Sequence, residues 1–206
     1  MAAEAYRPAP VDARIAAAAD LPAVAATMAE AFYDDPVWGW AFPDSERRLE
    51  QHRVLWRFAV ESALDYRWVW LTADCASASL WIPPGEPELR PEDEERMEPL
   101  LVELLGDGAA RVLDTFERFD AAHPQGEPHY YLSLLATHPD HRGRGLGMGL
   151  LADNLVRIDA EGAPAFLESS NPANDHRYER LGFVRCGEFK LAEGGPSVTQ
   201  MWRDPR

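Results

Sequence analysis

One segment carries most of the information about the fold of this chain: Leu135-Ala136-Thr137-His138-Pro139-Asp140-His141-Arg142-Gly143-Arg144-Gly145-Leu146-Gly147. Before it, Tyr130 to Thr137 is a nearly continuous apolar run, which predicts a buried strand. After it, the pattern predicts a helix through about Glu161. A helix N-terminus has unpaired N–H groups and a partial positive charge, and glycine lets a ligand approach the backbone closely. With its two arginines, this strand-to-helix junction suits a doubly charged group such as a pyrophosphate.

Three classes of phosphate-bearing cofactor compete for such a loop. A nucleotide P-loop ends in Gly-Lys-Ser/Thr, and this loop contains no lysine. A dinucleotide fingerprint needs Gly-x-Gly-x-x-Gly directly after the strand. Gly147-x-Gly149-x-x-Ala152 fits its degenerate form, but the nine residues from His138 to Leu146 separate it from the strand. Its glycines therefore fall inside the helix, and coenzyme A is the cofactor that remains.

The motif Arg142-x-x-Gly145-x-Gly147 resembles the Gln/Arg-x-x-Gly-x-Gly/Ala motif of the GNAT superfamily of N-acetyltransferases. A second segment agrees, because Asn174 precedes Tyr178 by four positions and the predicted short helix ends in Leu-Gly-Phe, as in the second cofactor segment of that superfamily. The strong resemblance covers residues 129–184, and residues 11–85 match only in outline. Within the superfamily the outline is similar to that of the puromycin N-acetyltransferases.

The resemblance implies a fold, a reaction and a cofactor. The fold is the mixed α/β (α+β) acyl-CoA N-acyltransferase fold, whose twisted mixed sheet splays open to admit acetyl-CoA (coenzyme A). The reaction is transfer of the acetyl group to a primary amine of a small molecule, by direct attack in a ternary complex. Cys75 and Cys186 lie outside the motif, which argues against a cysteine intermediate. Three alternatives stay open: a non-catalytic acyl-CoA-binding sensor, an acyltransferase for another acyl-CoA, and one that acts on a peptide amine.

By resemblance, the backbone of the strand and the loop holds most of the cofactor. A free strand edge can pair with the pantetheine arm as it pairs with another strand, and one N–H there would polarise the thioester carbonyl. Asn174 would contact the cofactor; Asn171 could do so instead, or shape the turn before Pro172. The expected cofactor-binding residues are Leu135, Ala136, Thr137, Arg142, Gly143, Arg144, Gly145, Gly147, Met148, Asn171, Asn174 and Tyr178.

Two residues are expected to move protons. Tyr178 corresponds to the tyrosine that protonates the departing thiolate, and a phenol with a pKa near ~10 is protonated at pH 7. The general base is less determined by the sequence. Glu168, in a strand predicted from Ala165, is taken with Tyr178 as the catalytic pair, although period-2 alternation leaves its face unsettled. The alternatives are His129, Glu30, Asp34 and Asp35.

Aromatic residues follow the helix break at Asp34-Asp35-Pro36. Several aromatics in one loop predict a pocket for a flat or apolar amine, with the expected lining Phe32, Asp35, Trp38 and Trp40. The other interpretation of Trp38, Trp40 and Phe42 is a hydrophobic plug over the core.

Composition limits the partners of the chain. The net charge of −15 disfavours nucleic acid, which binds to basic faces. The acidity has two further interpretations, solubility of the chain and attraction of a cationic substrate. The histidines and cysteines show no zinc-ligand spacing, so no metal site is expected. Without an apolar stretch near the ~18 residues of a membrane span and without a signal-like N-terminus, we expect a cytoplasmic monomer or homodimer with no membrane partner.

The chain is predicted to form a flexible tail, residues 1–10, and a single domain, residues 11–206. Within that domain, residues 86–125 predict a helical insertion between two strands. Its first helix opens at the acidic run 92–95, since acids suit a helix N-terminus, and Gly106 ends it. Other helices are expected at 20–32, 45–66, with Ser45 as a cap, and 174–181, and other strands at 11–15, 68–71, 76–82, 183–191 and 198–202.

Overall fold

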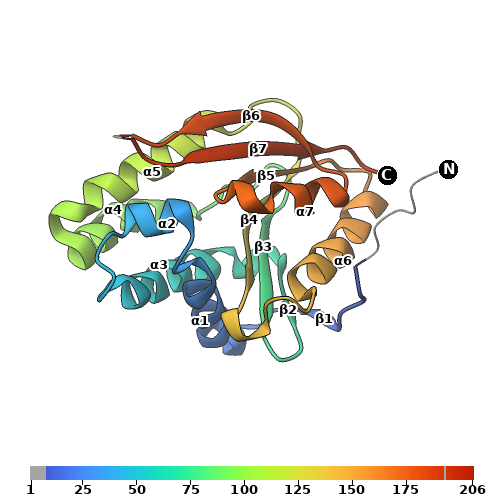
Figure 1. Cartoon of the computed structure of the whole chain (residues 1–206), viewed down its shortest axis with the longest axis horizontal. Coiled ribbons are helices and arrows are strands. Elements are labelled where there is room, and N and C mark those ends of the chain that lie inside the picture. The colour runs from blue at the N-terminus through green and yellow to red at the C-terminus, as the bar shows by residue number, and fades with distance from the viewer. Residues whose placement is uncertain (1–7, 193) are drawn as a thin grey trace.

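The computed structural model describes residues 8–192 and 194–206, so residues 1–7 of the predicted tail lie outside the described residues. Within the described residues, one seven-stranded sheet has the order β1-β2-β3-β4-β5-β7-β6 (Figure 1). Its strands are β1 (Ala13–Ile15), β2 (Val69–Thr72), β3 (Ser77–Ile82), β4 (Tyr130–Thr137), β5 (Ala165–Ser169), β6 (Val184–Lys190) and β7 (Ser197–Arg203). The β4–β5 pair is parallel and the other pairs are antiparallel, which confirms the predicted mixed sheet.

Helices cover both faces of this sheet, over two hydrophobic clusters. Period-2 alternation divides the strands between them: Leu80 faces one cluster and its neighbour Trp81 the other. The first face packs against α1 (Leu21–Phe32), α2 (Pro36–Ala41), α3 (Arg48–Ala63), α4 (Pro91–Leu105) and α5 (Ala109–Ala122). The second packs against α6 (Leu146–Ala160), with Tyr178 of α7 (Asp175–Arg180) at its margin.

The centre of the sheet separates after a bulge in β4. Leu80 pairs with Leu134 and Trp81 with Leu132, so Ser133 is an extra residue that bends the strand. β4 pairs with β5 only from Tyr130 to Leu132. Beyond that point, β5 continues to pair with β7 alone, and the edge of β4 that faces β5 is left open.

Two predicted features of the N-terminal half are corrected by the structure. Residues 36–41 form the helix α2 rather than a loop, because the Asp35 carboxylate caps it by accepting hydrogen bonds from the N–H groups of Val37 and Trp38. Ser45 does not cap α3. Asp44 performs the equivalent role, since its carboxylate accepts from the N–H groups of Glu46 and Arg47 in the turn before the helix.

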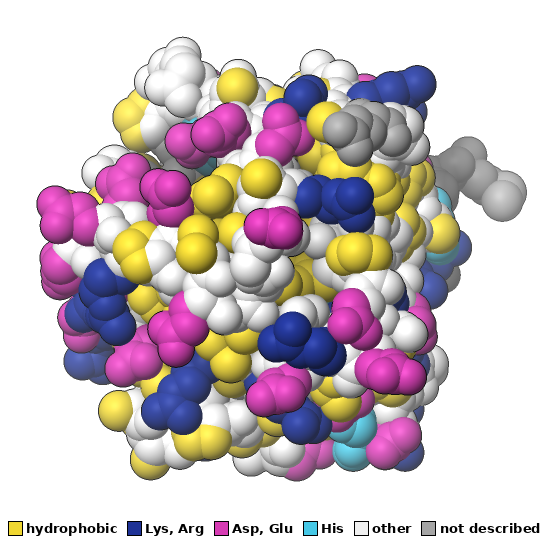
Figure 2. All heavy atoms as spheres, turned by 90° about the vertical axis from the view of Figure 1, so that its left-hand side faces the viewer, with side chains coloured by type: hydrophobic (Ala, Val, Ile, Leu, Met, Phe, Trp, Pro, Cys, Tyr) yellow, Lys and Arg dark blue, Asp and Glu magenta, His cyan; other side chains and the backbone are white. Residues whose placement is uncertain are grey.

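The two helices predicted in residues 86–125 are present as α4 and α5, joined by a 3-10 turn at Gly106–Gly108. Figure 2 views the molecule from the side on which these helices lie in Figure 1, and acidic side chains are spread among apolar ones over that face. No helix among the described residues has both the length and the apolar character needed to cross a membrane.

Candidate active site

Two cavities meet where β4 and β5 separate. The first, of about 450 Å³, lies along the segment 141–148 and is called the loop cavity here. The second, of about 480 Å³, lies between the strands and the helices α1 to α5 and is called the helical cavity. The residues that line both are Phe32, Asp35, Leu135, Asn171, Asn174 and Tyr178. We call this shared region the junction.

Glycine forms the floor of the loop cavity for two reasons. Gly145, the N-cap of α6, has a φ of +77°, which a side chain would strain. At Gly147 the reason is space, because a Cβ would lie 2.7 Å from Thr137 Oγ1. The first turn of α6 therefore lies directly against β4, with no side-chain cap on its N–H groups. This cavity is also lined by three other residues that the sequence predicts to bind the cofactor: Arg142, Gly143 and Met148.

The open edge of β4 turns its backbone toward the cavities. The N–H of His138 donates to the carbonyl of Ala76 next to β3, at 2.8 Å. Backbone groups of alternate residues point to opposite edges, so those of Leu135 and Thr137 face the opening. Ala136 lies on the β3 side, where its carbonyl accepts from Ser77 Oγ at 2.6 Å, and it lines neither cavity. The expected role of Ala136 is therefore corrected.

Positive side chains lie at the loop cavity. The guanidinium of Arg142 is oriented by a 2.8 Å hydrogen bond to the carbonyl of Ala31. Arg144 does not line the cavity; its guanidinium lies 3.5 Å from the Asp140 carbonyl and from His141 Nδ1. Arg177 of α7 does line it, next to Tyr178.

Tyr178 lies at the junction, and its ring packs edge-on against Phe183. Burial, together with the charges of Asp35 and Asp175, raises the pKa of Tyr178 to about 12. Asn171 shapes the local turn, since its side-chain oxygen accepts from the N–H of Ala173 at 3.1 Å. It also lines both cavities, so both interpretations of Asn171 agree with its position.

Asp35 connects the start of α2 to the end of β5. Its Oδ1 caps α2, and its Oδ2 accepts a 2.7 Å hydrogen bond from Ser170 Oγ at the end of β5. Burial raises the pKa of Asp35, and the hydrogen bonds from Ser170 and the helix oppose that effect. No local sequence pattern predicted the contact between Asp35 and Ser170 or the short helix α2.

Glu168 faces the helical cavity, which settles the face that the sequence left open. Phe166, two residues before it, packs against the α1–α5 side of the sheet. Glu168 Oε2 accepts a 2.9 Å hydrogen bond from Tyr131, and its Oε1 is buried without a partner among the described residues. Burial raises the pKa of Glu168 to about 8, the bond from Tyr131 lowers it, and the charges of Glu88 and Asp120 raise it further.

The other candidate bases occupy different places. His129 lies outside both cavities, where Nδ1 donates to the Glu127 carbonyl and the ring packs against Phe166 and Trp202. Glu30 forms an ion pair with Arg53 and lies outside both cavities as well. Asp34 lines the loop cavity but not the helical one.

Aromatic rings form the walls of the helical cavity. Trp38 packs edge-on against Trp56 at 4.7 Å between ring centroids and lies near Phe116 and Phe119 of α5. Trp40 is not part of this wall. Its ring lies beneath the guanidinium of Arg111 at 5.2 Å, because residues two apart on a helix do not share a face. The expected pocket role of Trp40 is thus corrected, and the α5 aromatics replace it.

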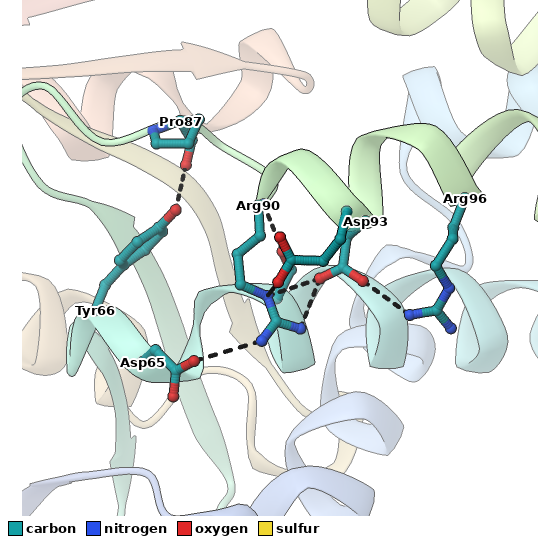
Figure 3. A network of polar contacts seen from close by, with 8 residues as sticks. Asp65, Tyr66, Pro87, Arg90, Asp93 and Arg96 are labelled. Atoms are coloured by element: carbon teal, nitrogen blue, oxygen red, sulfur yellow. Dashed lines mark hydrogen bonds and ion pairs between the residues drawn. The ribbon is translucent and has the colours of Figure 1, made fainter.

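A network of polar contacts anchors the wall that α4 provides (Figure 3). Asp93 is buried and binds both Arg90, at 2.6 Å, and Arg96, at 2.9 Å. Arg90 also reaches Asp65, and the hydroxyl of Tyr66 donates to the carbonyl of Pro87. The segment between β3 and α4 is therefore tied to the end of α3.

The chain resembles a known family over its central part. The family model described as Acetyltransferase (GNAT) domain matches residues 104–185, a span that contains β4, the loop, α6, β5 and α7. An uncharacterized N-acetyltransferase of Schizosaccharomyces pombe is 26% identical over 194 residues, which are 88% of this chain and 77% of that protein.

Solved structures share the whole architecture. A structure described as histone acetyltransferase HPA2 and related acetyltransferase from Corynebacterium glutamicum has a TM-score of 0.71 and 25% identity, over 96% of this chain and 98% of that chain. An agmatine N-acetyltransferase mutant has a TM-score of 0.63 at 13% identity, over 95% and 100%. Arylalkylamine N-acetyltransferase 2 from Aedes aegypti has a TM-score of 0.64 at 10% identity, over 95% and 99%. The last two show likeness of fold alone.

Proposed function

We propose that this chain, an acetyltransferase of the GNAT superfamily with the fold predicted from its sequence, transfers the acetyl group of acetyl-CoA to a primary amine of a small molecule. The observation that carries the proposal is the junction. Two cavities of similar volume open onto the same few residues, so two ligands can be held at once with their ends facing each other. That arrangement supports direct transfer in a ternary complex.

The loop cavity fits a coenzyme A pyrophosphate. Gly147 leaves a space that a Cβ would fill, the first N–H groups of α6 have no side-chain cap, and Arg142 and Arg177 line the cavity. The backbone edge at Leu135 and Thr137 would pair with the pantetheine arm. When bound, the cofactor supplies an activated acetyl thioester. The proposed cofactor-binding residues are those predicted from the sequence, except Ala136 and the side chain of Arg144.

Tyr178 acts as the general acid. With a pKa of about 12 it is protonated throughout the working pH range, and it lines both cavities at the junction. A phenol in that state can donate its proton to a leaving thiolate. No hydrogen bond of its hydroxyl to another described residue competes for that proton.

Glu168 acts as the general base. Burial raises its pKa to about 8, close to neutral, and it borders the helical cavity. A base with a pKa near the working pH can take a proton from an amine and return it to solvent. The Tyr131 hydroxyl orients the carboxylate through Oε2.

The acceptor is a small amine. The helical cavity, at about 480 Å³ and enclosed by α4 and α5, suits a small molecule. Two proteins with this fold are named for agmatine and for arylalkylamines, and the resemblance to the puromycin N-acetyltransferases supports the same class.

The test is release of free thiol from acetyl-CoA with a panel of primary amines, followed by mass measurement of the product. We expect an acetylated amine and one equivalent of free coenzyme A per turnover. A purified, folded chain that neither binds coenzyme A in calorimetry nor releases thiol with any amine would refute the proposal. Propionyl-CoA and longer donors, assayed in parallel, measure the acyl preference.

A further inference from the structure

We infer that the acceptor carries a second positive charge, held by acidic side chains of the helical cavity while the reacting amine lies at the junction. This inference rests on the proposed function and names the class of its acceptor: an apolar chain or ring bearing two cationic groups. Four observations support it.

The first is the charge of the wall. Seven acidic side chains line the helical cavity, and no Lys, Arg or His of the described residues lines it. None of the seven forms an ion pair with a described residue, although the chain contains many other acids that do. The seven are Asp35, Glu88, Glu94, Glu98, Glu117, Asp120 and Glu168. A concave surface of one charge sign attracts a ligand of the other.

The second is the position of the charge relative to the junction. Ser133 Oγ donates a 2.6 Å hydrogen bond to Glu88 Oε1, which holds that carboxylate beside β4 two residues before Leu135. Two residues of a strand span about 7 Å. Burial raises the pKa of Glu88, the hydrogen bond from Ser133 lowers it, and the nearby charge of Asp120 of α5 raises it further. A cation near Glu88 and Asp120 is therefore separated from the junction by roughly the length of a short alkyl chain.

The third is the surface between the two ends. Trp38, Trp56, Phe116 and Met97 line the cavity and offer apolar and aromatic contact. Two polar atoms of the wall, Glu168 Oε1 and Trp56 Nε1, are buried and have no hydrogen-bond partner among the described residues. Buried polar atoms are normally paired, so we expect a bound ligand or a water molecule to form hydrogen bonds with these two atoms.

The fourth concerns the kind of cation. Within residues 8–192 and 194–206, no three Asp, Glu, His or Cys side chains gather closely enough to hold a metal ion. The carboxylates are instead distributed along a cavity with apolar walls. That spacing fits an ammonium or guanidinium group on an organic chain.

Three probes that share a chain of six carbons separate the possibilities: 1,6-diaminohexane, hexylamine and 6-aminohexanoate. Their far ends are cationic, neutral and anionic, respectively. We expect kcat/KM for thiol release to be about tenfold or more higher for the diamine than for hexylamine, and lowest for 6-aminohexanoate. Added salt should reduce the difference.

Variants assign the effect to the cavity. In Glu88→Gln/Asp120→Asn, the ratio of the diamine to the hexylamine kcat/KM should fall toward one. The control is Glu95→Gln/Glu103→Gln, which removes the same charge from α4 at two positions that do not line the cavity. That control should keep the wild-type ratio. A ratio equally reduced in both double variants would assign the effect to net charge and overturn the inference.

Failure of the inference differs from failure of the function. Thiol release that is as fast with hexylamine as with the diamine overturns the inference and leaves the acetyltransferase activity standing. If none of the three probes is acetylated, calorimetry of 1,6-diaminohexane with the enzyme–coenzyme A complex decides. Binding that Glu88→Gln/Asp120→Asn weakens by about tenfold supports the inference, and absence of binding overturns it.

Discussion

The hydroxyl of Tyr131 donates a 2.9 Å hydrogen bond to Glu168 Oε2, between neighbouring strands at the level where they separate. The bond fixes one oxygen of a carboxylate whose other oxygen has no partner among the described residues. It also stabilises the ionised form and so limits the rise in the pKa of Glu168 that burial causes. The acid–base behaviour of the site is therefore set by a contact across the sheet.

The pH dependence of catalysis should report this carboxylate. As a base, Glu168 works when ionised, so kcat/KM should rise with pH to a plateau, with a midpoint near 8 in the free enzyme. Glu168→Gln should lose this limb and about 10²-fold or more of the rate. Tyr131→Phe removes the hydrogen bond that lowers the pKa, so the midpoint should move to higher pH. A Glu168→Gln profile that keeps the wild-type limb contradicts the assignment.

Stability should also depend on Glu168. Its pKa is raised in the folded state above the usual 4.5, so the folded chain binds the proton more tightly. The favourable contribution is complete below about pH 4.5 and is lost as the pH rises through about 8. The free energy of unfolding of Glu168→Gln, measured by urea titration, should therefore fall less than that of wild type between pH 5 and pH 9. Parallel curves for the two proteins would refute the raised pKa.

Replacing Tyr178 by Phe should lower kcat by about 10²-fold or more, because the proton donor is lost. The affinity for coenzyme A and the melting temperature should change little, since the ring keeps its contact with Phe183. Stopped-flow thiol detection with calorimetry separates the two quantities. Tyr33→Phe, which removes a hydroxyl bonded to the Ser45 carbonyl away from both cavities, serves as the control. Equal rates for Tyr178→Phe and wild type would exclude the acid role.

A side chain at position 147 should weaken cofactor binding. The Cβ of Gly147→Ala would approach Thr137 Oγ1 to 2.7 Å, and that hydroxyl lies 3.1 Å from Ser77 Oγ, so α6 must move away from β4. We expect the Kd for coenzyme A to rise about tenfold, together with about 1–3 kcal/mol of destabilisation. Gly126→Ala, where a Cβ meets no atom within 4 Å, should change neither quantity in calorimetry or unfolding.

The network that anchors α4 should be important for stability. Asp93→Ala leaves Arg90 without its buried partner and should cost about 2–4 kcal/mol in urea unfolding. Asp114→Ala breaks the more exposed pair with Arg118 and should cost about 1 kcal/mol or less. Similar losses in the two variants would show that the buried network adds nothing beyond a surface pair.

Local signals predicted a large part of this molecule. The elements from Tyr130 to Leu181 were located by an apolar run, a glycine-rich turn and a helix stop, each of which acts within a few residues. The short helix α2 was missed because Asp34-Asp35-Pro36 was interpreted only as the end of the preceding helix, whereas the Asp35 carboxylate also caps the next one. Trp40 was misplaced for the same reason, since a helix turns Trp38 and Trp40 to different sides.

By itself, the sequence determined the strand, loop and helix that suit a coenzyme A pyrophosphate, and the tyrosine that follows them, because those features depend on neighbours in the chain. Only the tertiary structure decided how the acceptor side is built. Glu88, Asp120 and Glu168 come from three separate segments, and Asp35 meets Ser170 across 135 positions of sequence. Burial raises the pKa of Asp35, Glu88 and Glu168, and their burial depends on which distant segments pack together.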